Sequence, residues 1–169
     1  DGLRFRSSGV ADVGQEIYVT GLNTVFVLDK LTGQVLRKKM FDYDFKVMAT
    51  PVLSHQQLIL STSDKGIVAL DKSTLEERWN FLTGEALIYT SSYSTPDQNK
   101  LVATVEAAVQ QSGSDLVFGA SDGYLYRLGE EGNLKGKINL GVPILAEVLI
   151  KDNLLYVMDF AGNVYCFEN

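Results

Sequence analysis

Few side chains in this sequence have the types and spacing that enzymes use. The chain has 169 residues, with one histidine and one cysteine. A Ser-His-Asp triad would have to use His55, which lies in the polar stretch 54–57. No Gly-x-Ser-x-Gly turn supplies a nucleophile, and a zinc site requires three or four His, Cys or carboxylate ligands. We therefore interpret His55 as a residue of a surface turn and identify no catalytic residue.

Carboxylates are the remaining candidates, because calcium prefers oxygen ligands. Asp64, Asp122 and Asp159 each lie among small or turn-forming residues. Asp64 and Asp122 occupy equivalent positions in two similar segments, where hairpin turns themselves favour Asp and Gly. Neither the Gly-x-x-x-x-Gly-Lys phosphate loop nor the Gly-x-Gly-x-x-Gly fingerprint is present. The sequence predicts no metal site and identifies no cofactor-binding residue.

Composition narrows the class of partner. The net charge is -6, and the sequence pI is about 4.8, whereas nucleic acids and anionic lipid surfaces require clustered Lys and Arg. No stretch approaches the roughly 18–20 apolar residues of a membrane span. Cys166 lies in the apolar run 164–167, where we expect a small buried side chain. The start at Asp1 is consistent with a piece of a longer protein.

An internal repeat must position these residues. Four segments of equal length align without a gap, and each has two β-rich runs around small or turn-forming residues: 17–28, 59–70, 117–128 and 156–167. Such patterns predict β-hairpins, because the turns favour residues that accept positive φ. Further apolar stretches precede the hairpins, at 8–11, 50–53, 107–109 and 146–149. An acidic turn and an outer strand follow the first two hairpins.

Each unit therefore predicts a four-stranded antiparallel sheet, which is one blade of a β-propeller. We expect an all-β, four-bladed, single domain over 1–169, with repeats at about 5–45, 46–101, 102–140 and 141–169. The second unit is the longest, so we place an insertion at 82–101, where 86–89 could add a short strand. Good helix formers occupy 105–111, but the repeat predicts an inner strand there.

The fourth unit ends without an outer strand, and segment 3–6 resembles the outer strand around Trp79. Pairing 3–6 with the fourth hairpin would remove an exposed sheet edge. Two arrangements fit: a closed four-bladed ring, or half of a larger ring completed by a second copy or by upstream blades.

The recurring motif resembles the PQQ-like, or quinoprotein-type, β-propeller repeat. It is carried by the stretches 27–33 and 121–126 and by 63–74, followed by Trp79. The resemblance implies that Trp79 and the turn residues dock one blade on the next. The first repeat departs from the pattern, with Arg37 in place of the Trp.

Members of this family include dehydrogenases that bind pyrroloquinoline quinone (PQQ) and calcium, outer-membrane assembly propellers, and accessory domains of secreted hydrolases. The repeat, together with the lack of catalytic signatures, favours a non-catalytic module without a cofactor, a protein-interaction or accessory scaffold, and the resemblance implies that it is part of a larger periplasmic or secreted protein. A homodimer that completes the ring is a further possibility. The alternatives are a fragment of a PQQ- and calcium-dependent dehydrogenase and a carbohydrate- or small-ligand-binding propeller. The candidate contact surface is the insertion at 82–101, which carries Tyr89 and Tyr93, because loops on a rigid scaffold often carry binding residues. The alternative, which the sequence favours, is a neutral surface insertion.

Overall fold

The computed structural model describes residues 9–43, 45, 49–88 and 103–169. Within these ranges the chain forms fifteen β-strands and no helix. The strands belong to four antiparallel sheets, and each sheet lies within one predicted repeat. The prediction of an all-β fold with four blades is confirmed, and we number the sheets as blades one to four.

The strands follow chain order within every blade. Blade one contains β1 (Ala11–Val13), β2 (Glu16–Thr20), β3 (Thr24–Asp29) and β4 (Val35–Met40). Blade two contains β5 (Val52–Ser54), β6 (Gln57–Ser61), β7 (Ile67–Asp71) and β8 (Glu77–Phe81). Blade three contains β9 (Gln110–Ser112), β10 (Asp115–Gly119), β11 (Tyr124–Leu128) and β12 (Leu134–Asn139). Blade four has only β13 (Leu149–Lys151), β14 (Leu154–Met158) and β15 (Val164–Glu168).

The four predicted hairpins are β2–β3, β6–β7, β10–β11 and β14–β15. Glycines with positive φ shape their turns, for example Gly66 at +66° and Gly123 at +84°. The gapless alignment is wrong for the first hairpin. Ile17 pairs with Leu28 there, whereas Leu58 pairs with Leu70 in the second hairpin, so the first turn is one residue shorter.

The inner strands begin about three residues later than the apolar stretches that predicted them. Two-residue turns set their register, because Ser54 pairs with Gln57 and Ser112 pairs with Asp115. Ala107, Ala108, Val109 and Val148 are buried without being strand, whereas Val10 is exposed, and residues 104–109 form no helix. The extra strand predicted at 86–89 is absent from the described residues 82–88.

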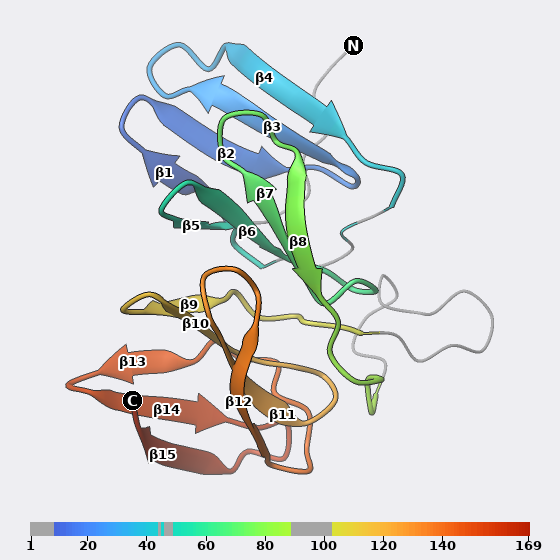
Figure 1. Ribbon diagram of the computed structural model, residues 1–169, viewed down its shortest axis with the longest axis vertical. Helices are drawn as coiled ribbons and strands as arrows, with labels where there is room; N and C mark the ends of the chain where they lie inside the picture. Colours follow the sequence, from blue (N-terminus) through green and yellow to red (C-terminus); the bar gives the residue numbers. More distant parts are fainter. Residues whose placement is uncertain (1–8, 44, 46–48, 89–102) are drawn as a thin grey trace.

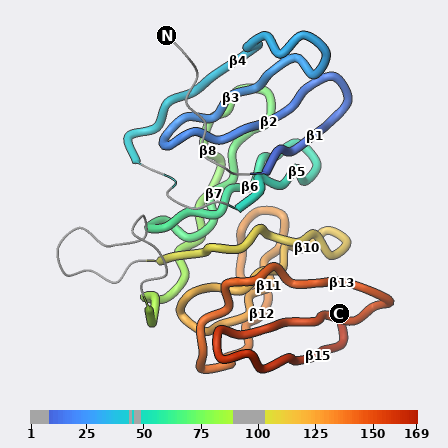
Figure 2. Tube along the Cα trace, turned by 180° about the vertical axis from the view of Figure 1, so that it is seen from behind, coloured from blue at the N-terminus to red at the C-terminus, as the bar shows by residue number. Residues whose placement is uncertain are grey.

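The blades follow one another as an open arc (Figure 1). The inner strands β1, β5, β9 and β13 lie along one side, and blades one and four lie at opposite ends, which the view from behind also shows (Figures 1 and 2). The described blades therefore do not close a four-membered ring. The predicted pairing of 3–6 with blade four lies outside the described residues.

Three apolar clusters form the core, one at each junction between consecutive blades. We call the face of a blade that points to the next blade its front, and the opposite face its rear. The front of blade two, with Ile59, Ile67 and Ala69, packs on the rear of blade three, with Leu116 and Phe118. The same alternation along each strand supplies both faces.

The prediction that Cys166 is buried is wrong, because its side chain is exposed. Cys166 lies on the front of blade four, and no described blade covers that face. No helix in the described part of the chain has the length and apolarity of a membrane span.

Candidate functional site

The hairpin turns and the loops between blades lie at the same end of the sheets. Each outer strand ends beside the hairpin turn of its own blade, because Thr24 pairs with Met40 and Ile67 pairs with Phe81. The insertion at 82–101 leaves β8 at this end. We call this end of the molecule the turn face.

Hydrogen bonds hold the start of the insertion on blade three. The backbone N–H of Gly84 donates to Oδ2 of Asp122 over 2.7 Å, and the N–H of Leu87 donates to the carbonyl of Ser121 over 2.9 Å. Both acceptors belong to the β10–β11 turn. A Cβ at Gly84 would lie 2.9 Å from Asp122 Oδ2, so the approach suits glycine.

The end of the insertion returns between the turns of blades two and three. The N–H of Val105 donates to the carbonyl of Thr62, and the Thr104 hydroxyl donates to the carbonyl of Ser63 over 2.6 Å. The carbonyl of Thr104 accepts from the N–H of Ser121 over 3.0 Å. Both ends of the insertion are thus fixed to a rigid base, while 89–102, with Tyr89 and Tyr93, lie outside the described residues.

Asp122 is the central acceptor of this base. Its side chain is buried and accepts the Tyr126 hydroxyl at 2.5 Å and the Tyr124 backbone N–H at 3.1 Å, besides Gly84. Burial raises the pKa of the Tyr126 phenol, and the bond to Asp122 raises it further. Asp122 therefore holds a loop on a turn.

The other candidate carboxylates also lie in turns. Asp159 accepts the backbone N–H groups of Ala161 and Asn163, both at 2.9 Å, and the Tyr165 hydroxyl at 3.0 Å. The Asn163 side chain donates to Asp159 as well and lowers the pKa of that carboxyl. Asp64 lies in the β6–β7 turn. Across 9–43, 45, 49–88 and 103–169, no three His, Cys, Asp or Glu residues gather to hold a metal.

The structure places His55 in the turn between β5 and β6, with φ of +52°. Its side chain is 52% exposed, and Nδ1 lies 3.2 Å from Glu130 Oε1 of blade three. The Ser54 hydroxyl is 3.4 Å from the same nitrogen, but Ser54 is only 2% exposed. The Ser54 hydroxyl is therefore not presented at the surface beside His55.

Trp79 docks blade two on blade three, as the repeat implies. Its indole N–H donates to Gln57 Oε1 over 2.8 Å, and the Gln57 amide donates to the carbonyl of Glu130 over 3.1 Å. A Cβ at Gly132 would lie 2.5 Å from the Trp79 ring, so the ring packs directly on that glycine. Gly132 has φ of +78°, which favours glycine independently.

An ion pair occupies the corresponding place in blade one. Arg37 lies opposite Val27 as Trp79 lies opposite Ala69. The guanidinium binds Glu16 through two bonds of 2.8 and 3.0 Å and, with the Tyr18 hydroxyl, lowers the pKa of Glu16 to about 2. The departure from Trp therefore replaces an indole-to-amide hydrogen bond by an ion pair within blade one and keeps the donor-to-acceptor pattern.

Blade three departs further, in a way that the sequence alone did not reveal. Gly136 takes the Trp position and lies opposite Arg127 of β11. Arg127 reaches Asp115 at 3.5 Å and donates to Asn169 Oδ1 of blade four over 2.7 Å. The only signal was a long side chain at Arg127, where the other repeats have small or medium residues.

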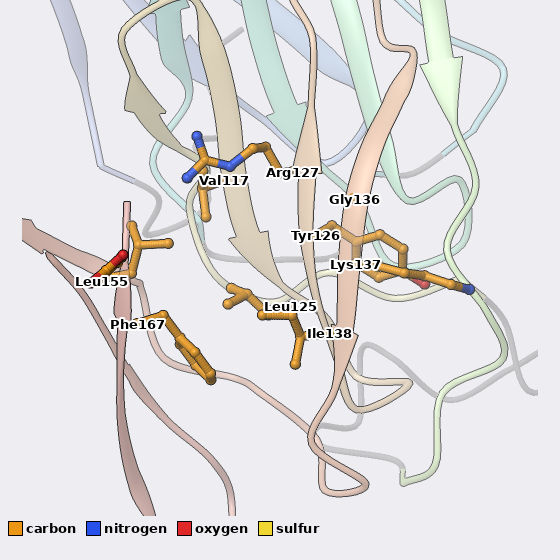
Figure 3. A pocket seen from close by; sticks show the side chains of 10 residues that line it. Val117, Leu125, Tyr126, Arg127, Gly136, Lys137, Ile138, Leu155 and Phe167 are labelled. Carbon is orange, nitrogen blue, oxygen red and sulfur yellow. The ribbon is translucent and has the colours of Figure 1, made fainter. Parts of the chain in front are cut away.

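A cavity of about 260 Å³ lies beside Gly136, between blades three and four. Leu125 and Ile138 of blade three face Leu155 and Phe167 of blade four across it (Figure 3). The absence of a large side chain at Gly136 explains the space. Arg127, Lys137 and Glu168 also line the cavity, so its apolar wall has charged side chains beside it.

Trp79 and the polar residues described above do not fit a site for a quinone cofactor. Such a site needs a stacking aromatic and several polar groups that converge on the ring axis, whereas Trp79 lies on outer strand β8 with its N–H bound to Gln57. We therefore derive no chemistry through PQQ.

Comparison with known proteins identifies the family. A family model described as outer membrane protein assembly factor BamB matches residues 4–169. The chain belongs to the BamB family. No curated protein sequence matches the chain.

Solved structures share the propeller fold. BamB from Moraxella catarrhalis matches with a TM-score of 0.72 and 19% identity, over 96% of this chain and 46% of that chain. The computationally designed Ika8 protein gives 0.69 and 19%, over 95% and 45%. A europium-containing methanol dehydrogenase gives 0.67 and 14%, over 95% and 41%. The chain thus spans less than half the length of these proteins.

Proposed function

We propose that this chain is a non-catalytic propeller module that binds protein through its turn face, within a larger extracytoplasmic protein. The observation that carries the proposal is the insertion, whose two ends are hydrogen-bonded to the turns of blades two and three. Loops projected from a rigid scaffold are where binding residues concentrate. The BamB family description, an outer membrane assembly factor, supports both a partner-binding role and an extracytoplasmic location.

Exposed apolar side chains support the choice of face. Several large ones lie at the turn-face end of the sheets: Leu22 at 40%, Met40 at 72%, Leu82 at 60%, Leu87 at 53% and Phe160 at 63% exposed. Exposed apolar surface with a polar rim is typical of protein interfaces. The opposite end carries charged turns, and its exposed apolar residues include Leu31 at 83%, Leu134 at 47%, Val13 at 41% and Val35 at 41%.

Site-specific photo-crosslinking in the native cell envelope tests this proposal. A photoreactive residue at Leu87 or Phe160 should give a discrete adduct with one protein, which mass spectrometry identifies. The control position is Leu31, at the other end of the sheets, where we expect no such adduct. A Leu82→Asp background should weaken the Leu87 adduct while leaving the far-ultraviolet circular dichroism unchanged. Equal adducts from Leu31 and Leu87 would contradict the proposal.

A fragment of a PQQ- and calcium-dependent dehydrogenase is the second candidate, favoured by the likeness to methanol dehydrogenase. At 14% identity this likeness concerns the fold alone. Trp79 lies on the outer strand β8 and its indole N–H is bound to Gln57, which argues against a quinone site in this chain. A carbohydrate- or small-ligand-binding propeller is the third candidate, and binding to defined glycans on an array would support it.

A further inference from the structure

The two ends of the arc expose positions that are buried at every internal junction. The pattern is clearest at the front position three residues before the closing Leu or Phe of each hairpin. Val25, Ile67 and Leu125 hold this position in blades one to three and are 0%, 0% and 3% exposed. In blade four the same position is Val164, which is 69% exposed.

Other front positions of blade four follow Val164. Cys166 is exposed, whereas its equivalents in blades one and two, Val27 and Ala69, are both 0% exposed, and Arg127 of blade three is half-buried. Met158 and Leu149 share this face and are 50% and 58% exposed. The front of blade four therefore has the composition of a blade junction but no described blade upon it.

The rear of blade one shows the complementary pattern on a smaller scale. Ile17 and Val19 are half-buried, whereas all their equivalents in blades two to four are at most 4% exposed: Leu58, Leu60, Leu116, Phe118, Leu155 and Val157. Phe26 and Leu28, at the other rear positions, are each 8% exposed. This end presents less apolar area than the front of blade four.

We propose that the front of blade four docks on the rear of blade one of a second copy, so that two chains close one eight-bladed ring. The two ends cannot meet within one chain, because blades one and four lie at opposite ends of the arc (Figures 1 and 2). A head-to-tail contact closes when the rotation of each chain adds up to a full turn. The chain covers 46% of the BamB chain and 45% of the Ika8 chain, so two copies correspond to about the length of one such propeller.

A second copy is thus one partner of the proposed scaffold, bound at the front of blade four and away from the turn face. The front of blade four includes the last described edge strand, β15, which has no pairing partner among the described residues beyond β14. Uncovered edges promote association with another chain. A second copy stacked on this face would cover the apolar front, as the next blade does at each internal junction.

Light scattering of the purified chain tests the proposal. The dimer should have twice the monomer mass of 18.6 kDa. Val164→Asp should yield monomer, with dimerisation weakened by more than about 1,000-fold, because each junction would bury an unpaired carboxylate. Leu31→Asp, which adds a charge in the exposed β3–β4 turn of blade one and on neither apolar face, should remain dimeric.

Ile17→Asp distinguishes the head-to-tail ring from a front-to-front dimer. In the ring, both junctions contain residue 17, so this variant should also be monomeric. Mixing it with Val164→Asp should restore a heterodimer through the single intact junction. A wild-type monomer at all concentrations would overturn the proposal, as would an Ile17→Asp variant that stays dimeric. Neither outcome bears on crosslinking at the turn face, so the two proposals fail separately.

Discussion

Replacing Trp79 by Ala should cost about 4 kcal/mol of unfolding free energy. A buried Trp→Ala change costs about 3–5 kcal/mol, so the half-buried Trp79 ring accounts for about 2 kcal/mol. The change also leaves Oε1 of Gln57, a residue only 1% exposed, without its donor, which adds about 2 kcal/mol. Trp79→Phe keeps most of the ring contact and should lose only this second contribution.

Gly132 tests the same contact from blade three. Gly132→Ala places a Cβ 2.5 Å from the Trp79 ring and strains a backbone with φ of +78°. In the Trp79→Ala background the clash disappears and the strain remains, so the two changes should be non-additive by at least about 1 kcal/mol. Since Trp79 is the sole Trp, the assay is urea unfolding followed by circular dichroism. Additive effects, or a Trp79→Ala cost below about 1 kcal/mol, would refute the docking role.

Three further predictions concern other described sites. The hydrogen bonds from Arg37 and the Tyr18 hydroxyl lower the pKa of Glu16 from 4.5 to about 2. The ionised carboxylate therefore contributes stability that is fully present above pH 4.5 and is lost as the pH falls toward 2. Glu16→Gln should flatten the curve of unfolding free energy against pH in this range. Asp122→Asn should speed amide exchange at Gly84 by roughly 10-fold, measured by hydrogen exchange, since a charged acceptor is lost. Cys166 should react with a thiol reagent without denaturant in monomeric variants, and more slowly in the dimer.

The sequence predicted the fold well because the repeat combines many weak signals. The hairpins and outer strands follow from apolar alternation and from Asp and Gly in turns. The inner strands begin later than predicted because two-residue turns such as 55–56 set their register. The turn at His55, with its positive φ, has no strong signal in the sequence. Cys166 was placed in the core from its apolar neighbours, but burial there depends on a next blade.

The candidate site was only partly predictable. Loop composition located the insertion, whereas the bonds from Asp122 to Gly84 and Tyr126 join two blades and depend on tertiary structure. The prediction of a short strand at 86–89 failed because Leu87 donates to the turn of blade three instead of to a sheet. In blade three the large Arg127 lies opposite the small Gly136, whereas in blade two the small Ala69 lies opposite the large Trp79. A residue-by-residue comparison with the motif does not show this reversal.

Calorimetric titration of the chain with PQQ, with and without calcium, tests the central claim of a non-catalytic module most directly. The Trp79 indole is hydrogen-bonded to Gln57, and the Asp122 and Asp159 carboxylates accept hydrogen bonds within their own hairpins. Because these side chains are already engaged, we expect only heats of dilution under both conditions. Saturable binding that requires calcium would contradict the scaffold proposal and favour a dehydrogenase fragment.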